Sequence, residues 1–138
     1  MKELTVEADT EQLETVTAFL NEQLEAKSCT MKVQTQLEIV VEEIFANIAN
    51  YAYPSKKGQV TIRIIVEEET LSMVITFIDS GIPYDPLKKE DPDITLSAEE
   101  REIGGLGVFL CKKLVDDMHY EYKDGKNILT IQKKLEVQ

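Results

Sequence analysis

Residues 59–79, "QVTIRIIVEEETLSMVITFID", determine the fold. This segment contains two runs, residues 59–67 and 70–79, that are rich in β-branched residues and alternate along the chain. A period of two is typical of β-strands. Because only a short acidic connection joins the two runs, the pattern predicts an antiparallel hairpin.

Two amphipathic helices are predicted before this hairpin, and a weakly alternating strand precedes both. The first helix spans residues 9–26, with Asp9 as the N-cap and Gln12 completing a capping-box variant. The second helix spans residues 30–53 and ends at Pro54, because proline cannot continue a helix.

The regular pattern ends after the hairpin. Residues 80–104 hold three of the four prolines and a dense group of acidic side chains. A segment of this length without regular structure predicts a functional loop or lid, which we place at residues 86–104. A glycine turn then begins a third helix over residues 104–118, and a closing hairpin follows over residues 119–135.

The predicted order is strand, helix, helix, strand, strand, lid, helix, strand, strand. Helices and strands are segregated along the chain, so we expect an α+β fold. Its expected architecture is a two-layer α/β sandwich, with a mixed, mostly antiparallel sheet and helices on one face. At 138 residues the chain suits a single domain, residues 1–138.

The composition limits the classes of function. The formal net charge of −11 argues against an extended nucleic-acid surface, which needs a basic patch. Cys29 and Cys111 are far apart and lack CxxC spacing, so we expect idle thiols in a reducing compartment. The chain begins without an apolar signal segment and has no membrane-spanning run. These features predict a cytoplasmic protein.

A line of polar residues follows the apolar stripe of the second helix. Glu43, Asn47 and Asn50 are spaced by four and three residues, so they lie on one helical face. A carboxylate there could act as a general base, and an amide oxygen could bind a hard cation such as Mg²⁺. On spacing alone, a solvated polar flank is the commoner interpretation.

A second candidate site lies at the end of the hairpin. Asp79 follows a strongly apolar strand and precedes Ser80 and Gly81. A sheltered carboxylate at this point can accept a hydrogen bond from a ligand amine. It would select adenine, which offers an exocyclic amine where guanine presents an acceptor. Taken alone, a simple Asp-Ser-Gly turn explains the same residues.

A third candidate site is the glycine turn before the third helix. Gly104, Gly105 and Gly107 allow close approach of the backbone, and the following helix N-terminus offers free N–H groups to phosphate. The spacing does not match a Rossmann fingerprint, because Leu110 occupies the third glycine position. It also lacks the Gly-Lys-Ser/Thr of a P-loop. Incidental glycines in a helix-entry loop are the alternative.

In this order the three sites resemble the GHKL superfamily of ATP-binding domains, with the Bergerat-type fold. The branch that contains single-domain anti-sigma factor serine/threonine kinases is the most similar. The resemblance extends over residues 5–135, and three segments carry it: "VVEEIFANIANYAYP" at 40–54, "IDSGIPYDP" at 78–86 and "GGLGVFLCKKLVDD" at 104–117.

The resemblance implies roles for individual residues. Asn47 would bind Mg²⁺ that bridges the ATP phosphates, and Glu43 would activate the attacking hydroxyl group. Asp79 would accept a hydrogen bond from the adenine amine. The full set of implied nucleotide-binding residues is Asn47, Asn50, Asp79, Gly81, Gly105, Leu106 and Gly107.

The implied function is that of a partner-switching kinase. Such a protein binds ATP, a sigma factor and an antagonist protein, and phosphorylates the antagonist on Ser or Thr. A homodimer is also implied. One position departs from the resemblance: Glu102 and Ile103 stand where a basic residue is expected, and the nearest cation is Arg101. The alternatives are therefore an ATP-dependent binding module without turnover, and a structural domain with a vestigial pocket.

Overall fold

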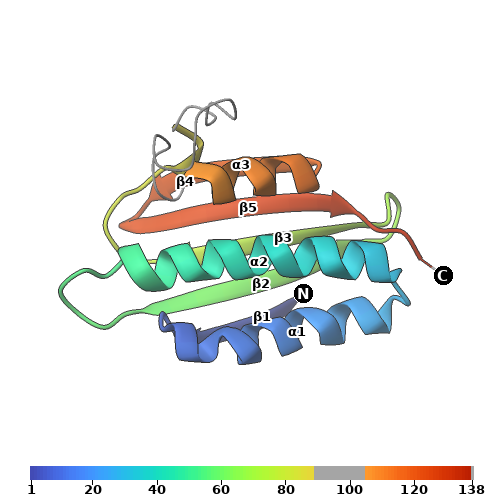
Figure 1. Cartoon of the computed structure of the whole chain (residues 1–138), viewed down its shortest axis with the longest axis horizontal. Helices are drawn as coiled ribbons and strands as arrows, with labels where there is room; N and C mark the ends of the chain where they lie inside the picture. Colours follow the sequence, from blue (N-terminus) through green and yellow to red (C-terminus); the bar gives the residue numbers. More distant parts are fainter. Residues whose placement is uncertain (89–104, 138) are drawn as a thin grey trace.

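A computed structural model describes residues 1–88 and 105–137 of the chain, and Figure 1 shows the arrangement of its elements. The elements are β1 (Lys2–Glu7), the 3-10 turn η1 (Thr10–Gln12), α1 (Leu13–Ala26), α2 (Met31–Tyr51), β2 (Gln59–Glu67), β3 (Ser72–Asp79), the 3-10 turn η2 (Pro86–Lys88), α3 (Gly105–Leu114), β4 (Asp117–Lys123) and β5 (Lys126–Lys134). The predicted order of helices and strands is confirmed. Apart from η2, the predicted lid lies outside the described residues.

The five strands form one sheet in the order β1-β2-β3-β5-β4. The predicted hairpin is present, with Ile62 of β2 opposite Phe77 of β3. On its other side Phe77 is opposite Leu129 of β5, which makes β3 the central strand. All four pairings of the described strands are antiparallel, so the expected mixed, mostly antiparallel sheet has no parallel pair among them.

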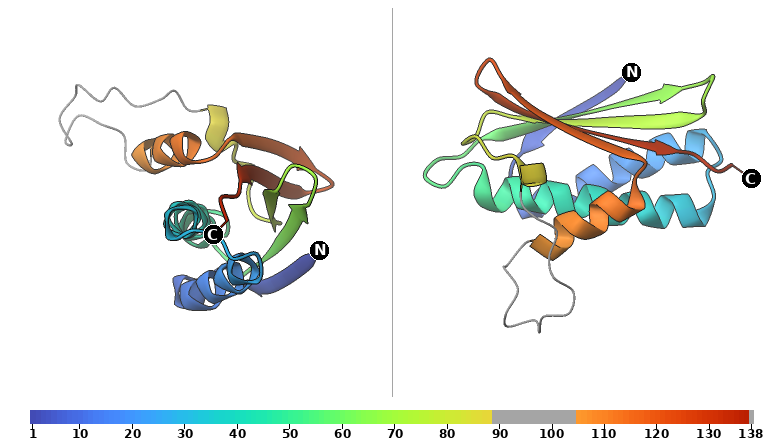
Figure 2. Two further views of the ribbon diagram at one scale, coloured as in Figure 1. Left: turned by 90° about the vertical axis from the view of Figure 1, so that its right-hand side faces the viewer. Right: turned by 90° about the horizontal axis from the view of Figure 1, so that it is seen from above.

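The three α-helices cover one face of the sheet, as the two views of Figure 2 show. This arrangement confirms the predicted two-layer α+β sandwich. Helix α2 is the central helix and contacts both α1 and α3. Its apolar stripe is buried against the sheet and consists of Val33, Leu37, Val40, Val41, Ile44 and Phe45. The inward residues of β2, β3 and β5 supply the opposite side of this core.

The helix ends follow local capping chemistry. Thr30 caps α2, since its hydroxyl oxygen accepts a hydrogen bond from the N–H of Val33. Asp9 caps the short turn η1 and not α1 itself. Gln12 makes no side-chain cap hydrogen bond, so the predicted capping box is absent. Helix α2 ends at Tyr51, slightly before the predicted end.

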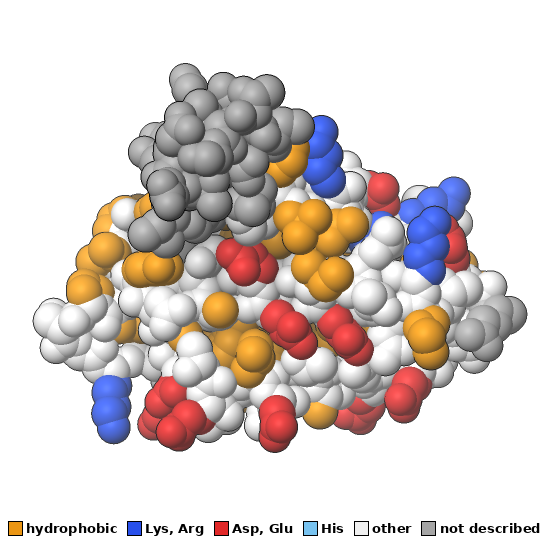
Figure 3. Space-filling view, viewed as in Figure 1, with side chains coloured by type: hydrophobic (Ala, Val, Ile, Leu, Met, Phe, Trp, Pro, Cys, Tyr) orange, Lys and Arg blue, Asp and Glu red, His pale blue; other side chains and the backbone are white. Residues whose placement is uncertain are grey.

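The surface reflects the negative net charge. Acidic side chains are scattered over α1 and α2 on the face shown in Figure 3, in keeping with the formal charge of −11. Among the described residues, no helix combines the length and apolar character that crossing a membrane requires.

Two neighbouring positions of α2 test the core assignment. Leu37 is fully buried and Ile39 is 39% exposed. We predict that Leu37→Ala lowers the free energy of unfolding by about 2–5 kcal/mol, because it leaves a cavity against the sheet. The matched control Ile39→Ala should change it by about 0.5 kcal/mol at most. Urea denaturation measures both, and equal losses would contradict the orientation of α2.

Candidate functional site

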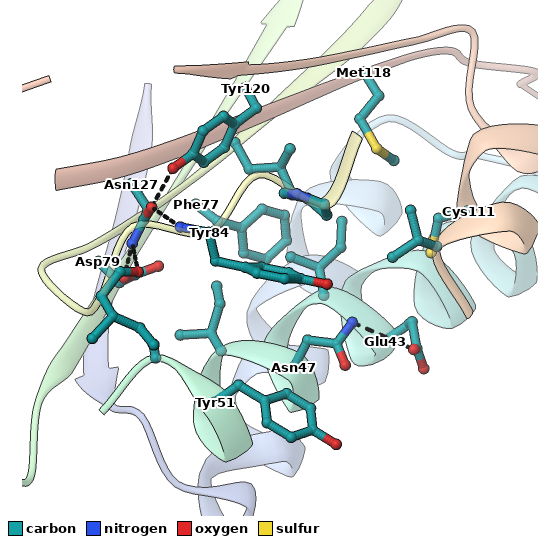
Figure 4. A pocket seen from close by; sticks show the side chains of 17 residues that line it. Glu43, Asn47, Tyr51, Phe77, Asp79, Tyr84, Cys111, Met118, Tyr120 and Asn127 are labelled. Atoms are coloured by element: carbon teal, nitrogen blue, oxygen red, sulfur yellow. Dashed lines mark hydrogen bonds between the residues drawn. The ribbon is translucent and has the colours of Figure 1, made fainter. Parts of the chain in front are cut away.

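A pocket opens between α2, α3 and the adjacent ends of β3, β4 and β5. It holds about 750 Å³ of space when its open mouth is counted. Its lining is mostly apolar, and its polar side chains gather at two ends (Figure 4). Asp79 and Asn127 lie at one end, and Glu43 and Asn47 lie at the other.

Asp79 is the last residue of β3 and is only 5% exposed. Its Oδ1 atom accepts hydrogen bonds from the N–H of Gly81 and from Nδ2 of Asn127, both at 2.9 Å. Burial raises the pKa of the Asp79 carboxyl above its ordinary value, and these two hydrogen bonds oppose part of that rise. The result is a sheltered hydrogen-bond acceptor at the edge of an apolar pocket.

Asn127 organises this end of the pocket, and the sequence analysis missed it. It stands opposite Asp79 in the pairing of β3 with β5. Besides Asp79, its Nδ2 donates to the carbonyl of Ile82 at 2.9 Å. Its Oδ1 accepts from the N–H of Tyr84 at 3.2 Å and from the hydroxyl of Tyr120. A buried amide with all its hydrogen bonds satisfied holds three strands and a loop together.

The end of α2 is fastened to the same loop. The hydroxyl of Tyr53 donates to the carbonyl of Gln59 at 2.6 Å and accepts from the N–H of Ser80 at 2.8 Å. The N–H of Ile82 donates to the carbonyl of Ala52 at 2.9 Å. These bonds fix the path of the chain directly after Asp79.

Gly81 is required at this junction for steric reasons. A Cβ atom on Gly81 would lie 2.3 Å from the carbonyl oxygen of Ala52, at the end of α2. Gly81 does not line the pocket itself. Its contribution is the close approach of the loop to α2, together with its N–H donation to Asp79.

At the other end of the pocket, Glu43 and Asn47 are one helical turn apart on α2. Nδ2 of Asn47 points to Oε1 of Glu43 at 3.5 Å, a long hydrogen bond. The first turn of α3 lies against the same carboxylate, since a Cβ atom on Gly107 would come within 1.9 Å of Oε1 of Glu43. A helix N-terminus favours anions, so this end suits a phosphate group, and its oxygen atoms suit a hard cation.

Other predicted site residues take different places. Asn50 is exposed and is not among the pocket-lining residues. Asn47 and Tyr51 line the pocket and lie on one side of Glu43 around the helix axis. At about 100° per residue, Asn50 lies about 20° from Glu43 on the other side, away from the pocket. Gly105 and Leu106 form the start of α3. Gly104 and residues 101–103 lie outside the described residues.

The metal and thiol chemistry of the site is restricted. Within the described part of the chain, no group of three or more His, Cys, Asp or Glu side chains could hold a metal ion. A cation near Asn47 would therefore need ligand oxygen atoms from a bound phosphate. Cys111 lines the pocket as a free thiol, and burial, followed by the charge of Glu43, raises its pKa to about 12. Cys29 is also free.

Comparison with known proteins relates this geometry to a family. The family model described as histidine kinase-like ATPase domain matches residues 6–133. The serine-protein kinase RsbW of Listeria monocytogenes is 30% identical over 98 residues, which cover 67% of this chain and 61% of that protein. The anti-sigma F factor of Clostridium acetobutylicum is 26% identical over 105 residues, which cover 76% of this chain and 72% of that protein.

The chain thus spans about 61% of the length of the Listeria relative. Among solved structures, the RsbU and RsbW domains of a Mycobacterium tuberculosis protein match with a TM-score of 0.63 at 16% identity. That match covers 98% of this chain and 33% of the other. At this level of identity the likeness concerns the fold alone, and it agrees with the predicted sandwich.

The burial of Asp79 predicts a pH dependence of stability. Because its pKa is raised in the folded state, the folded protein holds this proton more tightly than the unfolded chain. The free energy of unfolding should therefore fall as pH rises from the ordinary value of 3.8 through the raised pKa. In Asp79→Asn this contribution is absent, because an amide does not titrate.

Urea denaturation of the wild type and Asp79→Asn at about pH 4 and about pH 7 measures this effect. We expect the variant to gain stability relative to the wild type at the higher pH. A difference that stays constant, or that changes in the opposite direction, would show that burial does not govern this carboxyl group.

Proposed function

Because the chain belongs to the family of histidine kinase-like ATPase domains, we propose that its pocket binds ATP and that the protein is a serine/threonine kinase of the anti-sigma factor type. The proposal treats residues 1–138 as one ATP-binding domain, with residues 86–104 as its lid. The observation that carries it is the arrangement of Asp79 and of Glu43 with Asn47 at opposite ends of one apolar pocket.

The adenine base of ATP occupies the end of the pocket beside Asp79. Because Asp79 is only 5% exposed, water competes little for its carboxylate oxygen atoms, and a ligand donor can bind them. The apolar and aromatic lining includes Phe77, Tyr84 and Met118, which suit a flat heterocycle. The exocyclic amine of adenine donates to Asp79, which gives the base its orientation.

The phosphates occupy the end of the pocket between α2 and the first turn of α3. Since Nδ2 of Asn47 is directed to Glu43, Oδ1 of Asn47 is the atom left for a cation. An amide oxygen together with phosphate oxygens fits Mg²⁺, which supplies charge neutralisation of the phosphates when it is bound. Glu43 accepts the proton of the attacking hydroxyl group, and Gly107 leaves room for its carboxylate.

The relatives support the substrate class. The names serine-protein kinase and anti-sigma F factor describe two of the similar proteins. By analogy we propose that this chain binds a sigma factor, and transfers the γ-phosphoryl group of ATP to a serine or threonine of an antagonist protein. A homodimer remains a prediction.

A second function is favoured by one feature of the sequence. Glu102 and Ile103 directly precede the glycine-rich segment 104–117, where the family resemblance calls for a basic residue near the transferred phosphate. Without that charge, the protein would bind ATP and use it to control a protein interface without turnover. Phosphoryl transfer distinguishes the two functions.

The decisive experiment combines calorimetry with a transfer assay. We expect the wild type to bind Mg-ATP and to transfer labelled phosphate to a candidate antagonist protein. Glu43→Gln should retain the Kd for ATP within about threefold and lose about 100-fold or more of the transfer rate, because it removes the general base. If ATP binds and the wild type transfers nothing, the regulatory module is the correct function. Transfer that is unaffected in Glu43→Gln would refute the role of Glu43.

Gly107 offers an independent test of the catalytic end. Gly107→Ala places a Cβ atom where the Glu43 carboxylate lies, so we expect at least about a tenfold loss of transfer rate from misplacement of the base. Leu110→Ala is the matched control on the same helix, since Leu110 is 46% exposed. Equal activity of the two variants would argue against the contact between α3 and Glu43.

A further inference from the structure

We propose that Asn127 is a positioning residue that sets the base selectivity of the pocket, by leaving the buried end with an acceptor and no free donor. The inference rests on the proposed nucleotide function and deepens it. Asn127 does not act on the phosphates and lies at the opposite end of the pocket from Glu43 (Figure 4). It acts through Asp79, the group that touches the base.

The orientation of the Asn127 amide is fixed by two backbone groups, one of which can only donate a hydrogen bond and the other only accept one. The peptide N–H of Tyr84 can only donate, so the atom of Asn127 that it meets at 3.2 Å is the oxygen Oδ1. The carbonyl of Ile82 can only accept, so the atom that it meets at 2.9 Å is the nitrogen Nδ2. The amide therefore cannot flip without breaking both bonds.

This orientation determines which oxygen of Asp79 faces the ligand. Nδ2 of Asn127 and the N–H of Gly81 both donate to Oδ1 of Asp79. Every hydrogen bond of the Asp79 carboxylate to the described residues ends on this one atom. Oδ2 is therefore left as the acceptor available to a ligand in the pocket.

The backbone of the loop after Asp79 has no spare N–H donor to offer. The N–H groups of Ser80 and Gly81 bond to Tyr53 and Asp79, respectively. The two other N–H groups of residues 80–84, at positions 82 and 84, bond to the carbonyl of Ala52 and to Asn127. The remaining residue of this loop is Pro83, which has no N–H.

Asn127 has no donor left for a ligand, because Nδ2 donates to Asp79 and to the carbonyl of Ile82. The hydroxyl of Tyr120 donates to Oδ1 of Asn127. A base that presents an amine at this edge gains a hydrogen bond to Oδ2 of Asp79. A base with a carbonyl at the same position places its oxygen opposite Oδ2 of Asp79. Both atoms are acceptors, so no hydrogen bond forms, which is unfavourable in a buried site.

Inosine triphosphate tests this inference, because its base has a carbonyl where adenine has the exocyclic amine, and a hydrogen on N1 accompanies that change. We expect the wild type, titrated with each nucleotide and Mg²⁺ by calorimetry, to bind ATP about 10- to 100-fold more tightly. In Asp79→Asn the two donors hold the amide oxygen in the place of Oδ1, so Nδ2 faces the pocket. This variant should bind inosine triphosphate at least as tightly as ATP.

Asn127→Ala tests the positioning role directly. Without the amide, the Asp79 carboxylate is free to turn, and we expect the preference for ATP to fall by about tenfold, with little change for inosine triphosphate. A purely structural role would weaken both nucleotides equally. Thr130→Ala is the matched control, because Thr130 lies on the same strand and loses a hydrogen bond to Thr76 away from the pocket.

Each outcome bears on the inference. If the wild type binds ATP and inosine triphosphate with equal affinity, the inference about Asn127 is overturned and the proposed function stands. Wild type that binds neither nucleotide overturns the proposed function and the inference with it. If Asn127→Ala does not fold, the preference of Asp79→Asn decides, since retained selectivity for ATP would show that Asn127 does not fix the exposed atom of residue 79.

Discussion

The buried hydrogen bond between Asn127 and Asp79 is the contact on which the proposed pocket depends. It crosses the β3–β5 pair at the point where both strands reach the cavity, so the register of the sheet places an amide opposite a carboxylate. The same amide holds the loop after β3 through Ile82 and Tyr84. Breaking this contact would leave a buried carboxylate with less compensation for its desolvation.

The central helix both fills the core and lines the pocket. One side of α2 fills the core with residues such as Leu37 and Phe45, which are fully buried. An adjacent side carries Glu43 and Asn47 into the pocket. Because the core side fixes the rotation of the helix, the polar side is held at a defined distance from α3, where Gly107 allows contact with Glu43. Packing against the sheet thus preorganises the end of the site proposed for the phosphates.

Much of the fold could be predicted from the sequence, because local patterns encode it. The period-two runs of residues 59–79 predicted the hairpin, and Thr30 marked the start of α2. Glu43, Asn47 and Asp79, which line one pocket, could be named as candidates because each stands in a short motif. Asn127 could not, because its role arises from pairing with a strand almost fifty residues earlier. The available signal was its inward position, two residues before Leu129 in the alternation of β5.

The central claim is that Asp79 receives an adenine through Oδ2 while Asn127 holds Oδ1. A crystal structure of the chain with Mg²⁺ and a non-hydrolysable ATP analogue tests it most directly. The account predicts the exocyclic amine about 2.7–3.2 Å from Oδ2 of Asp79, with the bonds of Asn127 to Ile82 and Tyr84 unchanged. A base bound away from Asp79, or an Asn127 side chain released to contact the base itself, would contradict it.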